Sequence, residues 1–413
     1  MGLIEKYLNR IGANRAVLAL SIARMSDGIG NSILFIIIPL FVAALPNIYF
    51  HLPLPILVGI LISTYGLTSA IMQPLMGALA DRLERRKLLI QIGLALIAFS
   101  TLAFILAQNF FDLLLLRILQ GVAVAITIPA SMALMTLITK KETRGGAMGV
   151  YSTLRMIGFA AGPLLGGYLQ THFGFNSAFL AGSGFVFFAM VLVQIWVDEI
   201  EPLNNSNHEK VKFKIIDFSL LNPGIISATI ATFLMALAFS MVVTLENEFN
   251  SRLNMNAFVF AAAFSAVMIS RLILQVPLGR YSDKIGRKPL ILLGLIIMAP
   301  ATFLLGEVTS VLQLVILRLV QGAAAAAIAA PAFAVAADLS QSGGEGRQMS
   351  LITTGFSLGL ATGPLIAGFL AVIFFELPFI VAGIMILIGA FIVYKYLPET
   401  VQGSRVIFNK NKK

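Results

Sequence analysis

Long apolar stretches alternate with short polar ones along most of the chain. A helix needs about 20 apolar residues to cross the hydrocarbon core of a bilayer, and lipid offers the backbone no hydrogen-bond partners, so each long stretch is expected to be helical. The twelve predicted spans are residues 16–45, 56–79, 88–107, 112–138, 145–170, 177–197, 223–247, 256–280, 289–306, 310–337, 346–374 and 377–397. The pattern predicts an all-α polytopic membrane protein with twelve transmembrane helices.

The composition agrees with this fold class. Of 413 residues, 58% are hydrophobic and 12% are charged, about half of the charged fraction that a soluble protein needs to cover its surface. This excludes a soluble enzyme, a disordered chain and a nucleic-acid-binding protein. No cysteine is present, and the three histidines have no partner at metal-ligand spacing, so neither a metal nor another cofactor is expected. Phosphate-binding and hydrolase motifs are also missing, which argues against an ATP-driven pump and against an enzyme.

The basic residues predict the orientation of the chain. The N-terminus, every second loop and the C-terminal tail hold 23 of the 29 Lys and Arg residues, whereas the other loops hold only Arg252. Cytoplasmic segments of membrane proteins carry this excess of positive charge. Both termini are therefore expected in the cytoplasm, and the net charge of +10 reports topology.

The longest polar connection divides the chain in the middle. Residues 198–222 are polar and of mixed charge, with six predicted spans on each side. We expect an N-terminal six-helix bundle over residues 1–197, a cytoplasmic linker over 198–222, and a C-terminal bundle with a cytoplasmic tail over 223–413.

The two halves repeat each other. Five short motifs recur in the same order at offsets of 201–203 residues. The matched positions include Gly77 and Asp81 with Gly279 and Asp283; Arg117 and Gln120 with Arg318 and Gln321; Arg144 with Arg347; and Gly158, Gly162 and Pro163 with Gly359, Gly363 and Pro364. Such agreement indicates duplication of a six-helix unit, giving two pseudo-symmetric bundles.

These motifs resemble those of the major facilitator superfamily over essentially the whole chain. The loop motif of that family is matched by Gly77–Lys87, except that Glu84 stands where the family has its second glycine; the second copy keeps Gly286. Arg117–Gly121 and Gly158–Gly167 are similar to the RxxQG and antiporter motifs of the twelve-helix drug–proton antiporter branch. The resemblance implies two bundles that rock about a central cavity near the membrane midplane.

Conserved spacing in the repeat suggests a cytoplasmic gate. Asp81 and Asp283 each end a predicted span. There, each could pair with an arginine at the start of a helix in the other half. We expect the crossed pairs Asp81 with Arg347 and Asp283 with Arg144, and we assign Gly77 and Gly279 to the same gate. The alternative is that the basic residues nearby are only topological anchors.

The glycines of the fifth and eleventh spans predict close helix packing. Small residues four apart let helix backbones approach in lipid, and proline bends the helix. We expect packing at the interface between the halves from Gly158, Gly162, Pro163, Gly166, Gly359, Gly363 and Pro364.

Charged residues inside the spans are the candidate coupling site, because burying a charge in a membrane is costly without pairing or function. Arg24, Asp27 and Asn31 share one face of the first span, and Asp27 lies about 16 Å from its cytoplasmic edge. Arg155 is expected at the same depth. Asp27 could therefore pair with Arg24 or with Arg155, and it is the main candidate for proton binding; the alternative is a permanently ionised structural pair.

Further candidates lie on other spans. Arg117, with Gln120, belongs to the motif that the resemblance associates with proton transfer, and Arg318 is its twin. Glu246 could be a second titrating site or an acid solvated at the outer edge of the membrane, and Arg271 could pair with a carboxylate or receive an anionic solute. Apolar cavity lining is expected from Phe35, Ile38, Met132, Met135, Phe239 and Met241.

We therefore predict a secondary transporter that works as a monomer in the inner membrane. Its expected partners are a small-molecule solute and the lipid bilayer, and its expected coupling ion is the proton. Efflux of a small amphipathic or hydrophobic compound by alternating access is the favoured function. One alternative is a proton-linked importer or facilitator of a metabolite, peptide or siderophore, whose anionic groups would bind buried arginines. The other is a receptor or scaffold without transport.

Overall fold

The computed structural model describes residues 15–46, 51–83, 85–139, 143–198, 222–339 and 345–401. Every regular element in these ranges is a helix, and each of the twelve predicted spans corresponds to one long α-helix. The elements are α2 (Arg15–Ala44), α3 (Leu54–Leu83), α4 (Arg86–Ala103), η1 (Phe104–Leu106), α5 (Phe110–Ile138), α6 (Arg144–Phe173), α7 (Phe175–Trp196), α8 (Pro223–Thr244), α9 (Glu246–Leu253), α10 (Ala257–Ile285), α11 (Arg287–Leu305), α12 (Val311–Asp338), α13 (Glu345–Ala371) and α14 (Leu377–Tyr396). The prediction of an all-α membrane fold is confirmed.

Eleven of the twelve long helices are apolar enough, as well as long enough, to cross a bilayer. Helix α6 is the exception, because its 30 residues include seven glycines and several polar side chains that lower its mean hydropathy. Large apolar side chains are exposed on many of the helices, among them Phe99, Ile195 and Phe391. Such extensive apolar surface is typical of contact with lipid.

The chain folds into two compact units. Unit 1 comprises residues 1–51 and 67–216, and unit 2 comprises 52–66 and 217–413. The predicted division put residues 52–66 in the N-terminal bundle, whereas this part of α3 packs with unit 2. The reason is a close contact with α13: a Cβ on Gly59 would lie 2.5 Å from the carbonyl oxygen of Pro364.

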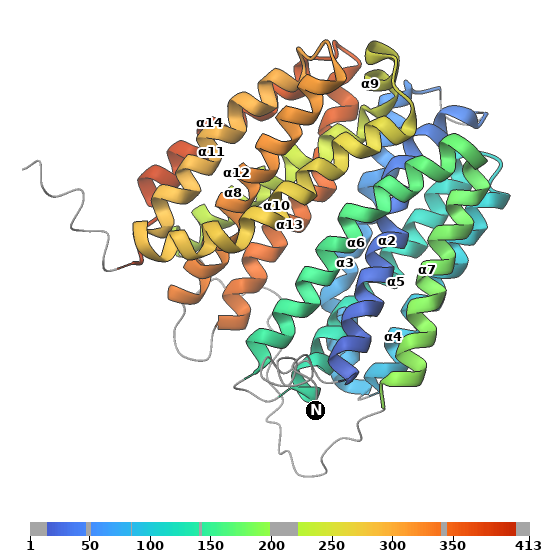
Figure 1. Cartoon of the computed structure of the whole chain (residues 1–413), viewed down its shortest axis with the longest axis horizontal. Helices are drawn as coiled ribbons and strands as arrows, with labels where there is room; N and C mark the ends of the chain where they lie inside the picture. Colours follow the sequence, from blue (N-terminus) through green and yellow to red (C-terminus); the bar gives the residue numbers. More distant parts are fainter. Residues whose placement is uncertain are drawn as a thin grey trace, which may run out of the picture. The chain divides into compact units, whose positions relative to one another are not determined.

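In unit 1, α2 packs against both α6 and α7, and α4 packs against α5 and α7 (Figure 1). Three glycines of α6, Gly158, Gly162 and Gly166, lie directly on the backbone of α2. The hydroxyl of Ser32 on α2 donates to the carbonyl oxygen of Gly158 at 3.3 Å. Glycine is needed here because a side chain would occupy the space that α2 fills.

Unit 2 repeats this arrangement with α8, α11, α12, α13 and α14. Gly359 and Gly363 of α13 lie on α8, and the hydroxyl of Ser240 donates to the carbonyl oxygen of Gly359 at 3.2 Å. The expectation that these glycines pack between the halves is therefore corrected. They face the first helix of their own unit, because the groove left by three small residues in register accepts that neighbouring helix.

Polar side chains cap the N-termini of several of these helices. Asn109 caps α5 by accepting from the backbone of Phe111 and Asp112, and Asp112 accepts in return from the backbone of Asn109. Asn222, Asn256 and Ser310 cap α8, α10 and α12. Each cap satisfies a backbone N–H that the first helical turn leaves without a partner.

Substitution of the packed glycine tests the α2–α6 contact. A Cβ on Gly158 would collide with the carbonyl oxygen of Met25, whereas Gly149, on the same helix, has nothing within 4 Å of that position. We expect Gly158→Ala to destabilise unit 1 by about 1–3 kcal/mol, the usual cost of overpacking. Gly149→Ala is the matched control and should leave stability unchanged or slightly raised, since alanine favours helices. Thermal stability of the purified protein in detergent is the measurement, and equal midpoints for both variants would contradict the assigned contact.

Candidate functional site

A buried polar triad occupies the middle of α2. Arg24 Nη1 forms an ion pair with Asp27 Oδ2, and Asn31 Nδ2 donates to Asp27 Oδ1 at 2.5 Å. The three residues are 7%, 2% and 7% exposed. We predicted that Asp27 pairs with Arg24 or with Arg155, and the structure pairs it with Arg24. Both carboxylate oxygens accept hydrogen bonds, which is the condition for burying an ionised acid.

Arg155 lies on α6 beside the same turn of α2. Its carbonyl oxygen is 3.2 Å from the position that a Cβ on Gly28 would occupy. The guanidinium carbon lies 5.3 Å from the centre of the Phe159 ring, and Phe159 contacts Phe35 with ring centres 6.2 Å apart. Phe159 thus places an aromatic surface beside Gly28, the residue after Asp27, and the Arg155 guanidinium lies near that ring.

A second polar network links α5 to α4. Arg117 Nη1 donates to Gln120 Oε1 at 3.2 Å, and Gln120 Nε2 donates to Thr101 Oγ1 at 2.9 Å. All three side chains are buried. Arg117 and Gln120 were predicted site residues, but Thr101 was not.

The same network recurs in unit 2, between α12 and α11. Arg318 Nη1 donates to Gln321 Oε1 at 2.8 Å, and Gln321 Nε2 donates to Thr302 Oγ1 at 3.1 Å. Thr302 follows Thr101 at the offset of 201 residues that relates the two arginines. That offset is the sequence signal that could have identified both threonines.

The surroundings of Arg318 are apolar. It is fully buried, and its guanidinium carbon lies 5.5 Å and 5.2 Å from the ring centres of Phe239 and Phe264. Neither Nε nor Nη2 has a hydrogen-bond partner among the residues that the structure describes. Aromatic faces attract a guanidinium, and this attraction partly replaces the missing hydrogen bonds.

The charged triad of α2 has no counterpart in unit 2. The equivalent hydrogen bonds of Ser32 and Ser240 align α2 with α8 at an offset of 208 residues. At that offset, Arg24, Asp27 and Asn31 correspond to Thr232, Met235 and Phe239. Duplication therefore kept the arginine–glutamine–threonine network in both units, whereas the carboxylate paired with an arginine inside a helix, Asp27, has an apolar counterpart in unit 2.

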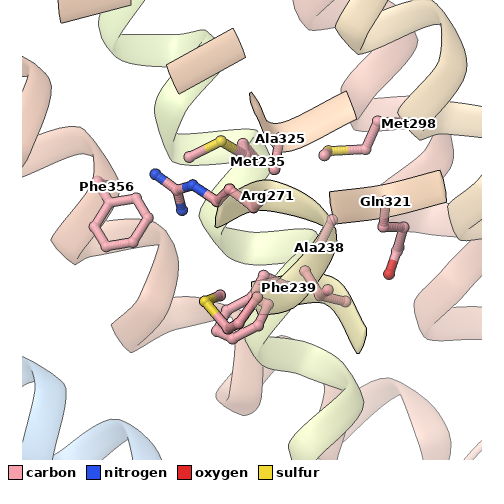
Figure 2. A pocket seen from close by; sticks show the side chains of 10 residues that line it. Met235, Ala238, Phe239, Arg271, Met298, Gln321, Ala325 and Phe356 are labelled. Carbon is pink, nitrogen blue, oxygen red and sulfur yellow. The ribbon is translucent and has the colours of Figure 1, made fainter. Parts of the chain in front are cut away.

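Unit 2 contains a narrow pocket between its helices, shown in Figure 2. Its interior has about 10 Å³ of space that a water-sized sphere can reach, enough for about one water molecule, so a larger ligand requires the lining side chains to move apart. The lining residues are Met235, Ala238, Phe239, Val267, Met268, Arg271, Met298, Gln321, Ala325 and Phe356. Of the apolar residues predicted to line a cavity, Phe239 does so here. Arg271, predicted to meet an anionic solute, is the charged residue of the lining.

Glu246 begins α9, immediately after the apolar part of α8. It is fully buried, and neither carboxylate oxygen makes a hydrogen bond within the described part of the chain. Burial raises the pKa of Glu246 well above the ordinary value of 4.5, and the nearby Asn250 side chain offsets part of this effect. Burial also raises the pKa of Glu248, less strongly. Glu246 can therefore hold a proton at a pH where exposed carboxyls are ionised.

The predicted gate is described in part. Gly77 lies near Pro129 and Gly279 near Ala330, and Asp283 forms an ion pair with Arg287 at 2.5 Å. The side chains of Asp81, Arg144 and Arg347 lie outside the described residues, so the crossed pairs stay a prediction.

A carboxylate does cap the start of α11, but it comes from the chain beyond α14. Glu399 accepts from the backbone of Arg287 at 3.0 Å and of Lys288 at 3.2 Å. This interaction was not expected from the sequence. It places negative charge at the positive end of the helix, as the gate hypothesis proposed for the aspartates.

The described residues include no cluster of three or more His, Cys, Asp or Glu side chains that could hold a metal ion. Instead, the buried groups are arginines, amides, hydroxyls and isolated carboxylates. These can bind protons and polar groups of a solute, and they can exchange partners when helices move.

Comparisons with known proteins agree with this architecture. The family model described as Major Facilitator Superfamily matches residues 20–245 and 228–411. The multidrug resistance protein MdtG of Dickeya zeae is 29% identical over 340 residues, covering 81% of this chain and 82% of the relative. MdtG of Klebsiella pneumoniae is 29% identical over 345 residues, covering 82% of each chain.

Solved structures show the same fold. A bacterial homologue of the human lysosomal transporter Spinster, inward-facing and unoccupied, has a TM-score of 0.77 at 15% identity and covers 92% of this chain and 96% of its own. The nucleoside transporter NupG, as a D323A mutant, has a TM-score of 0.76 at 13% identity, with coverages of 93% and 100%. Together with the match to the family model in both halves, these likenesses show that the chain is a multi-pass membrane transporter of the major facilitator superfamily.

Proposed function

We propose that this transporter exports a small amphipathic compound across the cytoplasmic membrane in exchange for protons. The relatives named as multidrug resistance proteins support efflux, and the buried Asp27 carboxylate is the observation that supports proton coupling. We further propose that the protein works as a monomer with both termini in the cytoplasm, as its basic loops favour, and that it carries out no catalysis and binds no nucleic acid.

Asp27 is the proposed proton-binding residue. In the described state its charge is balanced by Arg24, so the triad carries no net charge inside the unit. Protonation of Asp27 would leave the triad with a net positive charge. A buried charge without a counter-charge is costly, and hydration of this face of α2 would lower that cost.

This charge change can couple protons to conformation. The ionised Asp27–Arg24 pair stabilises a state in which the α2 face is dry, and the protonated form favours a state in which water reaches it. A proton then shifts the equilibrium between facing states by its different affinity for each. Export follows if the protein releases the solute to the outside in the same facing state in which it takes up the proton.

Glu246 is the proposed second titrating group. It has no basic partner among the described ion pairs, so its protonated form is the stable one while it remains buried. Its position just beyond α8 would let it take up a proton at one end of unit 2. Asp27 and Glu246 thus combine a carboxylate paired with an arginine and a carboxyl whose protonated form is favoured by burial.

Substitution of Asp27 tests the coupling. The protein is reconstituted in liposomes that contain a pH-sensitive dye, and naphthalenesulfonate or (naphthylmethyl)trimethylammonium is added under an imposed pH gradient; both probes keep a fixed charge. We expect one probe to move opposite to protons in the wild type. Asp27→Asn should reduce this proton movement to the level of protein-free liposomes, because the amide cannot bind the proton.

The matched control is Glu307→Gln, which removes an exposed carboxylate between α11 and α12 and should retain coupling. Proton movement in the same direction as the probe would replace export by proton-linked import. Antiport that persists unchanged in Asp27→Asn would contradict the assignment of Asp27.

Replacement of Glu246 tests its protonation. A raised pKa means that the folded protein binds this proton more tightly than the unfolded chain, so its contribution to stability is present at low pH and is lost as pH rises through the raised pKa. Glu246→Gln cannot ionise. It should match the wild type at low pH and be more thermostable above the pKa of Glu246.

The control for this pH series is Glu376→Gln. The hydrogen bond from Arg252 lowers the pKa of Glu376, so its contribution has the opposite sign and is lost as pH falls. This variant should show no gain in stability at high pH. Thermal midpoints in detergent across the pH range are measured, and parallel curves for wild type and Glu246→Gln would rule out a buried, protonated Glu246.

A further inference from the structure

Unit 2 carries positive charge inside two of its helices, and none of its described carboxylates forms an ion pair with that charge. Among its described helices, the charged residues with seven or more helical positions on each side are Arg271 and Arg318. The described carboxylates of unit 2 lie at or beyond the ends of these helices, and none forms an ion pair with either arginine. Charges at this depth are normally paired or functional.

The position that supplies the carboxylate in unit 1 is apolar in unit 2. Asp27, the partner of Arg24, corresponds to Met235. Met235 itself lines the pocket that contains Arg271. At the same offset Arg24 corresponds to Thr232, so unit 2 lacks both members of the ion pair. Met235 thus places an apolar side chain beside Arg271, which has no acidic partner among the described ion pairs.

The guanidinium of Arg271 is available to such a ligand. Its Nε donates to Gln275 Oε1 at 3.3 Å, which leaves Nη1 and Nη2 without a hydrogen bond to the described residues. Its carbon lies 5.8 Å from the centre of the Phe356 ring. Figure 2 shows the guanidinium between Phe356 and Met235. Packing on an aromatic face fixes the plane of the guanidinium, so that both terminal nitrogens can donate to the same ligand.

The rest of the pocket is adapted to an apolar body. Met235, Met268 and Met298 contribute flexible thioether side chains, and Phe239 contributes an aromatic face. Methionine surfaces adjust to ligands of different shape. Gln321 also lines the pocket, and it holds Arg318 through a hydrogen bond of 2.8 Å. Arg318 is thus held by a residue of the lining, although it does not line the pocket itself.

We propose that this pocket of unit 2 binds the acidic head group of an amphipathic organic anion, with Arg271 as its counter-charge. The terminal nitrogens of Arg271 donate two parallel hydrogen bonds to the acidic oxygens, and the apolar part of the ligand extends over the methionine and phenylalanine side chains. This inference rests on the proposed function, and it defines the solute as an anion rather than a lipophilic cation.

Three probes with one apolar body separate charge from hydrophobicity. They are naphthalenesulfonate, its neutral amide naphthalenesulfonamide, and (naphthylmethyl)trimethylammonium. Binding to the purified protein is measured by equilibrium dialysis in uncharged detergent. The wild type should bind the sulfonate at least about tenfold more tightly than the other two, as expected for a charge-assisted pair of hydrogen bonds.

Arg271→Gln should lose that preference, with sulfonate affinity falling about tenfold or more and amide affinity unchanged. Arg271→Lys should recover part of it, because the charge returns without the paired geometry. Arg280→Gln is the matched control, since it removes an exposed positive charge from the same helix, and it should bind like the wild type. A folded Arg271→Gln protein is verified by its retained affinity for the amide.

An anionic lipid could supply the same chemistry, so the dialysis is repeated with phosphatidylglycerol. Unchanged sulfonate binding, together with sulfonate flux in liposomes of phosphatidylcholine, supports a solute site. Displacement of the probe by phosphatidylglycerol without such flux would identify a lipid site and overturn the proposal.

Equal binding of all three probes, preference for the cation, or binding of none would also overturn it. Proton antiport of the cation without sulfonate binding would reject this pocket assignment and leave the proposed function intact. Sulfonate binding that depends on Arg271 but is never accompanied by proton movement would support the pocket assignment and contradict proton-coupled export.

Discussion

Burying a guanidinium among apolar helices is the constraint on which the polar architecture of both units depends. An isolated charge in such surroundings is costly, and each solution seen here lowers that cost differently. Arg24 is paired with a carboxylate. Arg318 is held by an amide and two aromatic faces, and Arg271 borders a pocket. The chemistry that this transporter can perform follows from which of these groups can exchange its partner.

Gene duplication supplied two similar scaffolds, and their differences suggest a division of labour. The arginine–glutamine–threonine network is present in both units with nearly the same geometry, which indicates a structural brace between neighbouring helices. The residues that differ at equivalent positions are the better candidates for function. Asp27 in unit 1 and Met235 in unit 2 are such a pair, and they lead to the proposals of a proton site in one unit and a solute pocket in the other.

Close helix packing is what brings these groups together. The α6 glycines allow α2 to approach until Gly28 lies beside the carbonyl oxygen of Arg155. The same contact between α13 and α8 fixes the helix that carries Met235 and Phe239. Because the contact involves backbone atoms, it cannot relax by side-chain rotation. The triad and the pocket are therefore each held by a rigid helix pair.

The sequence by itself determined the membrane class, the number of long helices, their boundaries within a few residues and the internal repeat, because lipid imposes length, hydropathy and helicity on each span. It also identified Arg24 and Asn31 as neighbours of Asp27, since spacing along one helix fixes which residues share a face. Tertiary structure decided the rest. Thr101 and Thr302, the pocket around Arg271 and the helices that the motif glycines contact all depend on residues from different helices. Helical periodicity tells which residues lie on one face, but the partner of that face is chosen by packing between segments distant in the chain.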